Sequence, residues 1–399
     1  MTILFAKRDF NSFIYCNTLH LLFICPIYDR IRLFANQDNG SILSILGIEG
    51  STTQVLGGDG GVAMIDYKSD PDLIYYYFSA QRARIIFRTT VHKVSGLVIE
   101  SGIVDPPFDA AFVPVTEMNP IDQKKFAIGG NVDGRIMLTE DRGDSYTSII
   151  AFPTTQGRIT AMSWSSDGKF VYAAANGFVG EVTRCDLALL ASPTCTIPVN
   201  VTSQPIAYLT SDPIDTNRVV AISASNTFGG SNPNIYESTD GGTTWNDITT
   251  SGSPIDKAYN GQSVVFVSNG SSSFLLAGTS NGIFVRTEGN WSPLAKGLPT
   301  VPIFEMVYSP ENDVLIIGTL GRGVWFLSNA FNVVSRSGDD IATDSFQQLN
   351  TKTNEGVSGE GIIGDSISQS IQNFSRIVPP EDLSDEDLNR KAIAPVPFP

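Results

Sequence analysis

The stretch STDGGTTWND, from Ser238 to Asp247, combines an aspartate, two glycines, several hydroxyl side chains and a tryptophan. Such a set can form either a ligand site or a tight turn. An aspartate side chain accepts hydrogen bonds from the amides of a turn, and glycine adopts positive φ without steric cost. We therefore interpret Asp240 as a turn residue, with Gly241 or Gly242 at positive φ, rather than as part of a reaction centre.

This stretch belongs to a unit that returns with a period of about 47 residues, in the range typical of radial arrays. Each unit has a β-like run, a polar turn rich in Pro, Asp and Asn, and a second apolar run. Seven copies of this pattern begin at Cys25, Ser69, Asn119, Ser165, Ser211, Ser268 and Ser309. Four short strands fit into each unit. The sequence therefore predicts an all-β fold, a seven-bladed β-propeller of four-stranded antiparallel blades.

The composition divides the chain into a propeller, residues 1–329, and an acidic tail, residues 330–399. The last repeat supplies three strands and lacks an obvious fourth, so we predict that Thr2–Lys7 completes it and closes the ring, which removes exposed sheet edges. The tail is polar, with Gly/Ser-rich pieces and an acidic run. Such a segment buries too little apolar surface to offset its ordering entropy, and we predict that it is disordered.

The turn sequence also carries a family resemblance. STDGGTTW (Ser238–Trp245) fits the pattern Ser/Thr-x-Asp-x-Gly-x-Thr-Trp, and TEDRGDSY (Thr139–Tyr146) is a degenerate copy. These motifs resemble the Asp box, or BNR repeat, of β-propellers in the sialidase, xyloglucanase and sortilin-like superfamily. The run VLIIGTLGRGVWFL, which begins at Val314, is similar to the last repeat of its sortilin-type and xyloglucanase-type members.

The resemblance implies that the aspartate binds turn amides and that the tryptophan packs under the neighbouring strand. The implied structural set is Ser238, Asp240, Gly242, Thr244 and Trp245. Because the superfamily includes hydrolases, sorting receptors and non-enzymatic scaffolds, the resemblance specifies a fold and leaves the function open.

Charge and composition argue against several partners. The formal net charge is −15, whereas nucleic acids and anionic membranes require clustered Lys and Arg. Two histidines are too few for a His-rich zinc site. We interpret the apolar stretch Asn11–Tyr28 as a buried strand; the alternative is an export signal or a membrane anchor, and only an anchor would bring the protein to a membrane. We expect a monomer without an organic cofactor.

Two aspartates, Asp38 and Asp59, fall on consecutive glycine-rich loops at the channel face of the expected propeller. Two carboxylates facing a groove, about 6.5–9.5 Å apart in inverting enzymes, are the minimal requirement for glycoside hydrolysis. Resemblance to xyloglucanases also implies an aspartate pair, although their Thr-Asp-x-Gly-Gly context is not matched here. One hypothesis is that the pair is catalytic; the alternatives are ordinary turn residues or Ca²⁺ ligands.

Further polar residues on loops of the same face are candidate ligand-binding residues: Gln37, Asp133, Asn176, Asn281 and Arg322. Two functions follow from these observations. The first is a non-catalytic binding or scaffold propeller that recognises a glycan or a protein through its channel face. The alternative is a xyloglucanase-like glycoside hydrolase that acts on a polysaccharide through an aspartate pair. The sequence does not decide whether the protein is an enzyme.

Cysteines and sequons bear on the compartment. Cys185 and Cys195 flank a short loop that can bring two strand ends together, so we predict a disulfide if the protein is exported and two thiols if it is cytosolic. Five Asn-x-Ser/Thr sequons also favour a secreted or cell-surface protein.

Overall fold

The computed structural model describes residues 19–25, 31–36, 40–45, 52–56, 60–336 with short gaps, and 346–348. The gaps within 60–336 are residues 84, 96, 105, 108, 113, 154–156, 177–178, 188–192, 224–233, 250, 258–260, 295–300 and 321.

The described strands form antiparallel sheets in which successive strands of the chain pair with each other. The first two sheets contain β1 (Leu19–Cys25), β2 (Ile31–Asn36), β3 (Gly40–Ile45) and β4 (Thr52–Leu56), then β5 (Gly60–Asp66), β6 (Leu73–Ala80), β7 (Ile86–His92) and β8 (Val98–Ile103). The next sheet contains β9 (Thr116–Met118), β10 (Phe126–Gly129), β11 (Arg135–Thr139) and β12 (Thr147–Ile150). A short 3₁₀ helix, η2 (Gln81–Ala83), joins β6 to β7.

The second half of the chain continues this pattern. One sheet contains β13 (Ile159–Trp164), β14 (Phe170–Asn176), β15 (Gly180–Asp186), β16 (Thr194–Cys195) and β17 (Val199–Thr202). The next contains β18 (Ile206–Ser211), β19 (Val219–Ser223), β20 (Ile235–Ser238) and β21 (Asn246–Asp247), followed by the 3₁₀ helix η3 (Pro254–Lys257). The last two contain β22 (Gly261–Ser268), β23 (Ser273–Thr279), β24 (Gly282–Thr287) and β25 (Asn290–Pro293), then β26 (Ile303–Ser309), β27 (Val314–Thr319), β28 (Val324–Ser328) and β29 (Phe346–Gln348).

The all-β propeller is therefore observed, but the prediction of seven four-stranded blades is wrong. Six of the described sheets have four strands, and the sheet that begins with β13 has five. In that sheet β16 and β17 both pair with β15, at opposite ends of it. Pro198 lies between them and has no amide hydrogen to donate, so it interrupts what would otherwise be one outer strand.

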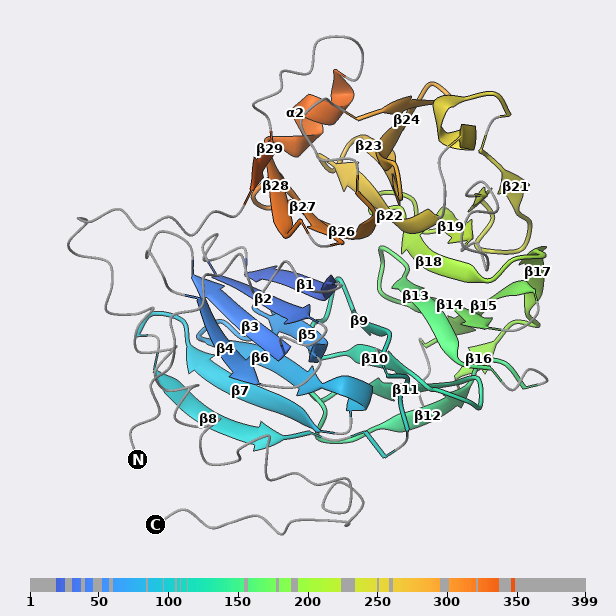
Figure 1. Ribbon diagram of the computed structural model, residues 1–399. Helices are drawn as coiled ribbons and strands as arrows, with labels where there is room; N and C mark the ends of the chain where they lie inside the picture. Colours follow the sequence, from blue (N-terminus) through green and yellow to red (C-terminus); the bar gives the residue numbers. More distant parts are fainter. Residues whose placement is uncertain are drawn as a thin grey trace, which may run out of the picture.

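The first strand of each sheet lies innermost, and together these strands surround the centre of the molecule (Figure 1). β13 contacts β18, β18 contacts β22, and β22 contacts β26. The ring closes where β26 contacts β1, which in turn contacts β5. The centre is therefore lined by strands from every part of the described chain.

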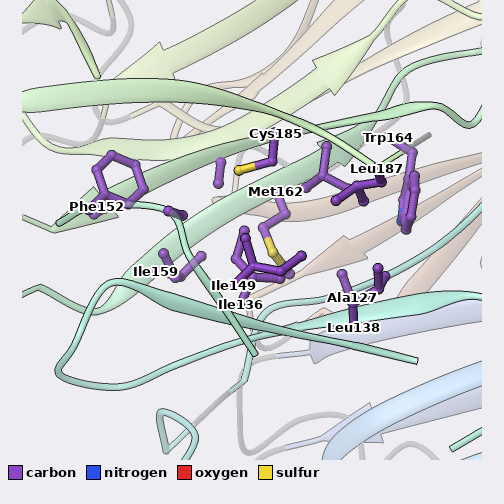
Figure 2. Close-up of a cluster of buried hydrophobic side chains, with 14 residues drawn as sticks. Ala127, Ile136, Leu138, Ile149, Phe152, Ile159, Met162, Trp164, Cys185 and Leu187 are labelled. Atoms are coloured by element: carbon purple, nitrogen blue, oxygen red, sulfur yellow. The ribbon is translucent and has the colours of Figure 1, made fainter. Parts of the chain in front are cut away.

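Hydrophobic layers between neighbouring sheets hold the ring together. Figure 2 shows one layer, between the β9–β12 sheet and the sheet that begins with β13. Its labelled side chains are Ala127, Ile136, Leu138, Ile149, Phe152, Ile159, Met162, Trp164, Cys185 and Leu187. A Cβ atom at Gly129 would lie 2.7 Å from the Cβ atom of Ile159. Glycine at this position therefore lets the two sheets approach closely.

The ring closes differently from the prediction. The outer strand of the last sheet is β29, and Thr2–Lys7, which were predicted to fill this place, lie outside the described residues. After β28 the chain forms the short helix α2 (Ala330–Ser335), which buries Ala330 and Val334. Phe346 then packs into the same hydrophobic cluster. The prediction of disorder from residue 330 onward is therefore wrong for these two elements, because their apolar side chains complete the core; residues 349–399 lie outside the described part.

Most innermost strands share one irregularity. Six of those described carry a register shift near their first residues, so that an extra residue is left unpaired. On the four strands β13, β18, β22 and β26 the skipped residues are Thr160, Ala207, Gln262 and Phe304. Such β-bulges redirect side chains and are common beside functional sites.

Candidate functional site

The turn between β20 and β21 is held by the side chains of Ser238 and Asp240. Asp240 Oδ1 accepts hydrogen bonds from the amides of Thr243 and Thr244 at 3.0 and 2.9 Å, and its Oδ2 accepts one from Thr244 Oγ1 at 2.6 Å. Ser238 Oγ accepts the amide of Gly242 at 2.8 Å. The hydrogen bonds from Thr244 are the main reason that the pKa of Asp240 falls to about 2.

The turn between β11 and β12 has the same hydrogen-bond pattern. Thr139 Oγ1 accepts the amide of Gly143 at 2.8 Å, while Asp141 accepts hydrogen bonds from the Ser145 amide at 2.8 Å and the Ser145 hydroxyl at 2.6 Å. Arg142 takes φ of 63° where the other turn has Gly241 at 71°. The two stretches therefore form one kind of turn despite their different sequences.

Both turns lie on the face opposite the described loops that carry Asp133 and Asn281. The amide of Gly241 donates to the carbonyl of Asn217, between β18 and β19, at 2.9 Å. Likewise the amide of Arg142 donates to the carbonyl of Lys124, between β9 and β10, at 3.0 Å. These contacts group the turns between first and second strands with those between third and fourth strands. Their carboxylates are engaged in local hydrogen bonds, so we do not assign them a chemical role.

Trp245 is only partly buried. Its indole Nε1 donates to the carbonyl of Gly242 at 3.1 Å, and its ring packs against a cluster that includes Tyr172 and Val182 of the neighbouring sheet. The tryptophan thus covers the join between two sheets and stays partly exposed to solvent.

Only some of the predicted site residues lie within the part of the chain that the structure describes. Asp38, Asp59 and Gln37 lie outside the described residues, and so does the side chain of Asn176, at the end of β14. Asp133 forms an exposed ion pair with Arg135, with 3.0 Å between its Oδ2 and Arg135 Nε.

The two remaining candidates lie on other loops. The amide of Asn281 donates to Thr279 Oγ1 at 3.0 Å, and the side chain of Arg322 is exposed. The pairing of Asp38 with Asp59 therefore stays a prediction, as does a Ca²⁺ site there.

A cavity of about 370 Å³ occupies the channel between the innermost strands β9, β13, β18, β22 and β26. This volume is within the range of small-molecule sites. The bulge residues Thr160, Ala207, Gln262 and Phe304 all line it. Its ionisable lining residues are Glu117, Arg158, Tyr208 and Glu305.

The two glutamates are the chemically unusual part of this channel cavity. Glu305 is 4% exposed, and its Oε2 atom has no hydrogen-bond partner among the described residues. Glu117 is half-buried, with the channel cavity beside it. Each belongs to an innermost strand, β26 and β9 respectively, and so they approach the cavity from different sheets.

Burial changes the protonation of this group. Loss of hydration raises the pKa of Glu117 to about 8. Burial also raises the pKa of Glu305 well above its ordinary value, with a further contribution from the charge of Glu117. Tyr208 has a strongly raised pKa for the same reason, reinforced by Glu305. Glu117 is therefore mostly neutral at pH 7.

The sequence carries a signal for these glutamates that the prediction did not use. Thr116-Glu117-Met118 and Phe304-Glu305-Met306 place a glutamate before a methionine in the first strand of two repeats. A charged residue inside an otherwise buried strand is unusual. Comparison of the repeats position by position would have placed both side chains at the centre of the ring.

Three further properties concern the compartment and metals. Cys185 and Cys195, the pair named from the sequence, form a disulfide between β15 and β16. No helix in the described ranges combines the length and apolar composition needed to cross a bilayer. In the same ranges, no group of three or more His, Cys, Asp or Glu side chains is placed to hold a metal ion.

Comparison with known proteins identifies the fold. No family model and no curated protein matches the chain. Among solved structures it is similar to an ancestral GH74 enzyme, with 11% identity, a TM-score of 0.59, and coverage of 84% of this chain and 46% of that chain. It is also similar to the GH74 xyloglucanase from Xanthomonas campestris, with 13% identity, a TM-score of 0.55, and coverage of 78% and 52%. The chain thus spans about half the length of both, and its structural neighbours are GH74 xyloglucanase-type β-propellers.

Proposed function

We propose that the protein is a glycoside hydrolase that acts on a polysaccharide, with Asp38 and Asp59 as its carboxylate pair. The observation that carries this proposal is the similarity of its propeller to two GH74 enzymes over 84% and 78% of the chain. This favours the hydrolase over the non-catalytic function that the sequence placed first. Asp141 and Asp240 are poorer candidates for the catalytic pair, because their carboxylates already accept hydrogen bonds within their own turns.

In the proposed reaction one aspartic acid protonates the leaving-group oxygen of the glycosidic bond. The other, ionised, removes a proton from the water that attacks the anomeric carbon. Gln37, Asp133, Asn176, Asn281 and Arg322 are proposed to bind sugar hydroxyls along the same face. Polar side chains that form hydrogen bonds with the sugar hydroxyls position the polysaccharide so that its glycosidic bond lies at the carboxylate pair.

The test is the release of reducing ends from xyloglucan and from a panel of other β-glucans by the purified protein. We expect cleavage by the parent, and a loss of about 10²–10⁴-fold in Asp38→Asn and Asp59→Asn, the range for an acid or base in catalysis. Asp240→Asn is the matched control, since it removes a carboxylate from the other face and should retain activity per folded molecule. Full activity of both channel-face variants, or no cleavage of any glucan by the parent, would contradict the proposal.

A second candidate is a non-catalytic propeller that binds a glycan or a protein. The observation in its favour is that the sequence around Asp38 and Asp59 does not match the Thr-Asp-x-Gly-Gly context of the xyloglucanases. It predicts retention on immobilised polysaccharide without release of reducing ends. Under either function we propose a monomer that is secreted or at the cell surface, since disulfides such as Cys185–Cys195 persist in oxidising compartments.

A further inference from the structure

We propose that the channel cavity binds the ammonium group of an amino sugar, a positively charged unit of a polysaccharide. The sugar part of this inference rests on the proposed function, whereas the positive charge is argued from the cavity alone. The binding residues are Glu117 and Glu305, with Tyr208 and Gln262 beside them.

The first step in the argument is unmet hydrogen bonding. Buried polar atoms in proteins are nearly always paired, and an unpaired one requires an explanation. The Oε2 atom of Glu305 is buried without a partner among the described residues. A carboxylate oxygen can only accept, so the missing partner is a donor.

The second step is charge. Among the described residues, two carboxyl groups share the cavity, and the other ionisable groups that line it are Tyr208, which is neutral at pH 7, and Arg158. Arg158 is exposed and does not neutralise them, since both glutamates keep a raised pKa. A buried carboxylate is stable when it is paired with a positive charge and hydrogen-bonded to it. An ammonium group supplies both the charge and three donors.

The third step is size and composition. A bare metal ion is disfavoured, because the described residues hold no group of three or more metal-ligating side chains. The cavity of about 370 Å³ is instead large enough for an organic molecule. Phe304 and Gln262, both at β-bulges, give it an apolar surface and an amide, the groups that bind a sugar ring and its hydroxyls. The net charge of −15 also attracts a cationic polymer to the protein.

The test compares D-glucosamine with N-acetyl-D-glucosamine and D-glucose by isothermal titration calorimetry at pH 6.5. The three probes share a pyranose ring, and only glucosamine carries a positive charge. Of the three probes, we expect only glucosamine to bind. Its binding should release protons, because a bound cation lowers the raised pKa of Glu117. Titrations in buffers of different ionisation enthalpy measure this release. Glu305→Gln and Glu117→Gln should each weaken binding by about 10- to 100-fold, as expected for loss of a charged hydrogen bond.

Glu140→Gln is the control, since it removes the same charge from a surface ion pair with Lys125. It should bind glucosamine as the parent does. Equal affinity for glucosamine and glucose, or the absence of glucosamine binding, would overturn the inference. Failure of the proposed function is distinguishable, because a protein that cleaves no glucan can still bind glucosamine, and a glucan hydrolase can fail to bind it.

Discussion

At the scale of single residues, the main result is the contrast between two kinds of carboxylic acid. Asp240 accepts several hydrogen bonds from its own turn, and these lower its pKa to about 2. Burial does the opposite to Glu117, whose pKa rises to about 8. The first residue is committed to the fold in its ionised form, whereas the second is destabilised as an anion. Only the second kind gains from a ligand.

Asp240→Ala should lower the free energy of unfolding by about 1–3 kcal/mol at pH 7, because it removes the hydrogen bonds that the ionised carboxylate accepts within the turn. A group with a depressed pKa contributes stability above its unfolded pKa and loses it as pH falls through the folded value. The difference from the parent should therefore shrink as the pH falls below about 4 and vanish only below about 2. Urea unfolding of both proteins over this pH range measures it, and a constant difference would contradict the account.

Trp245→Ala, made in parallel, should cost about 3 kcal/mol, the lower end of the range for loss of a large ring, because this ring is only partly buried.

The channel glutamates should give the protein an opposite pH dependence. Between the unfolded pKa of a glutamate and about 8, the folded state keeps a proton on Glu117 that the unfolded state has lost. Stability should therefore decrease as pH rises through this window, by up to about 1.4 kcal/mol per pH unit for one proton. Glu117→Gln should flatten the profile when chemical unfolding is measured from pH 5 to 8. An unchanged slope in that variant would mean that Glu117 ionises normally.

At the scale of elements, the closing strand β29 and helix α2 act as one unit. Phe346 is 8% exposed and lies in the same cluster as Val334. Phe346→Ala should lower the free energy of unfolding by about 3 kcal/mol, because it opens the core of the last sheet. Ser328→Ala is the control at an exposed end of β28 and should melt like the parent. Similar melting of both variants would show that β29 adds little to the ring.

The strands and turns of the structure could be predicted from the sequence only in part. The repeat pattern and the turn chemistry of Asp240 were sufficient to predict a propeller and the face on which its aspartate turns lie. The closing strand could not be predicted, because Phe346 is one aromatic residue in a polar stretch and helix α2 separates it from its partner strand β28. The division of one outer strand into β16 and β17 depends on Pro198, a residue that is not part of the repeat pattern.

The bulges were missed for another reason. Their extra residues, such as Thr160 and Gln262, are ordinary side chains whose direction is set by hydrogen-bond register between strands. Register depends on the packing of whole sheets around the centre, and no local pattern specifies it. The channel cavity was therefore beyond local analysis, even though its two glutamates stand out once the repeats are compared.

At the scale of the whole molecule, the propeller is a ring of sheets that pack mainly against their ring neighbours. The innermost strands β9, β13, β18, β22 and β26 contribute lining to one cavity, so the cavity exists only in the closed ring. Binding at this centre would join five sheets through a single ligand and would stabilise the ring by mass action. The candidate site and the fold are thus coupled in this protein.

The contact between β26 and β1 differs from the others, since it joins segments far apart in the chain without a direct connection. Separation at this place leaves an open arc with two exposed surfaces that fit each other. The surface exposed at β1 of one molecule then fits the surface exposed at β26 of the next, in a head-to-tail association that does not close into a ring. Heating concentrated protein should accordingly produce linear polymers built from intact sheets, before any sheet has lost its strands.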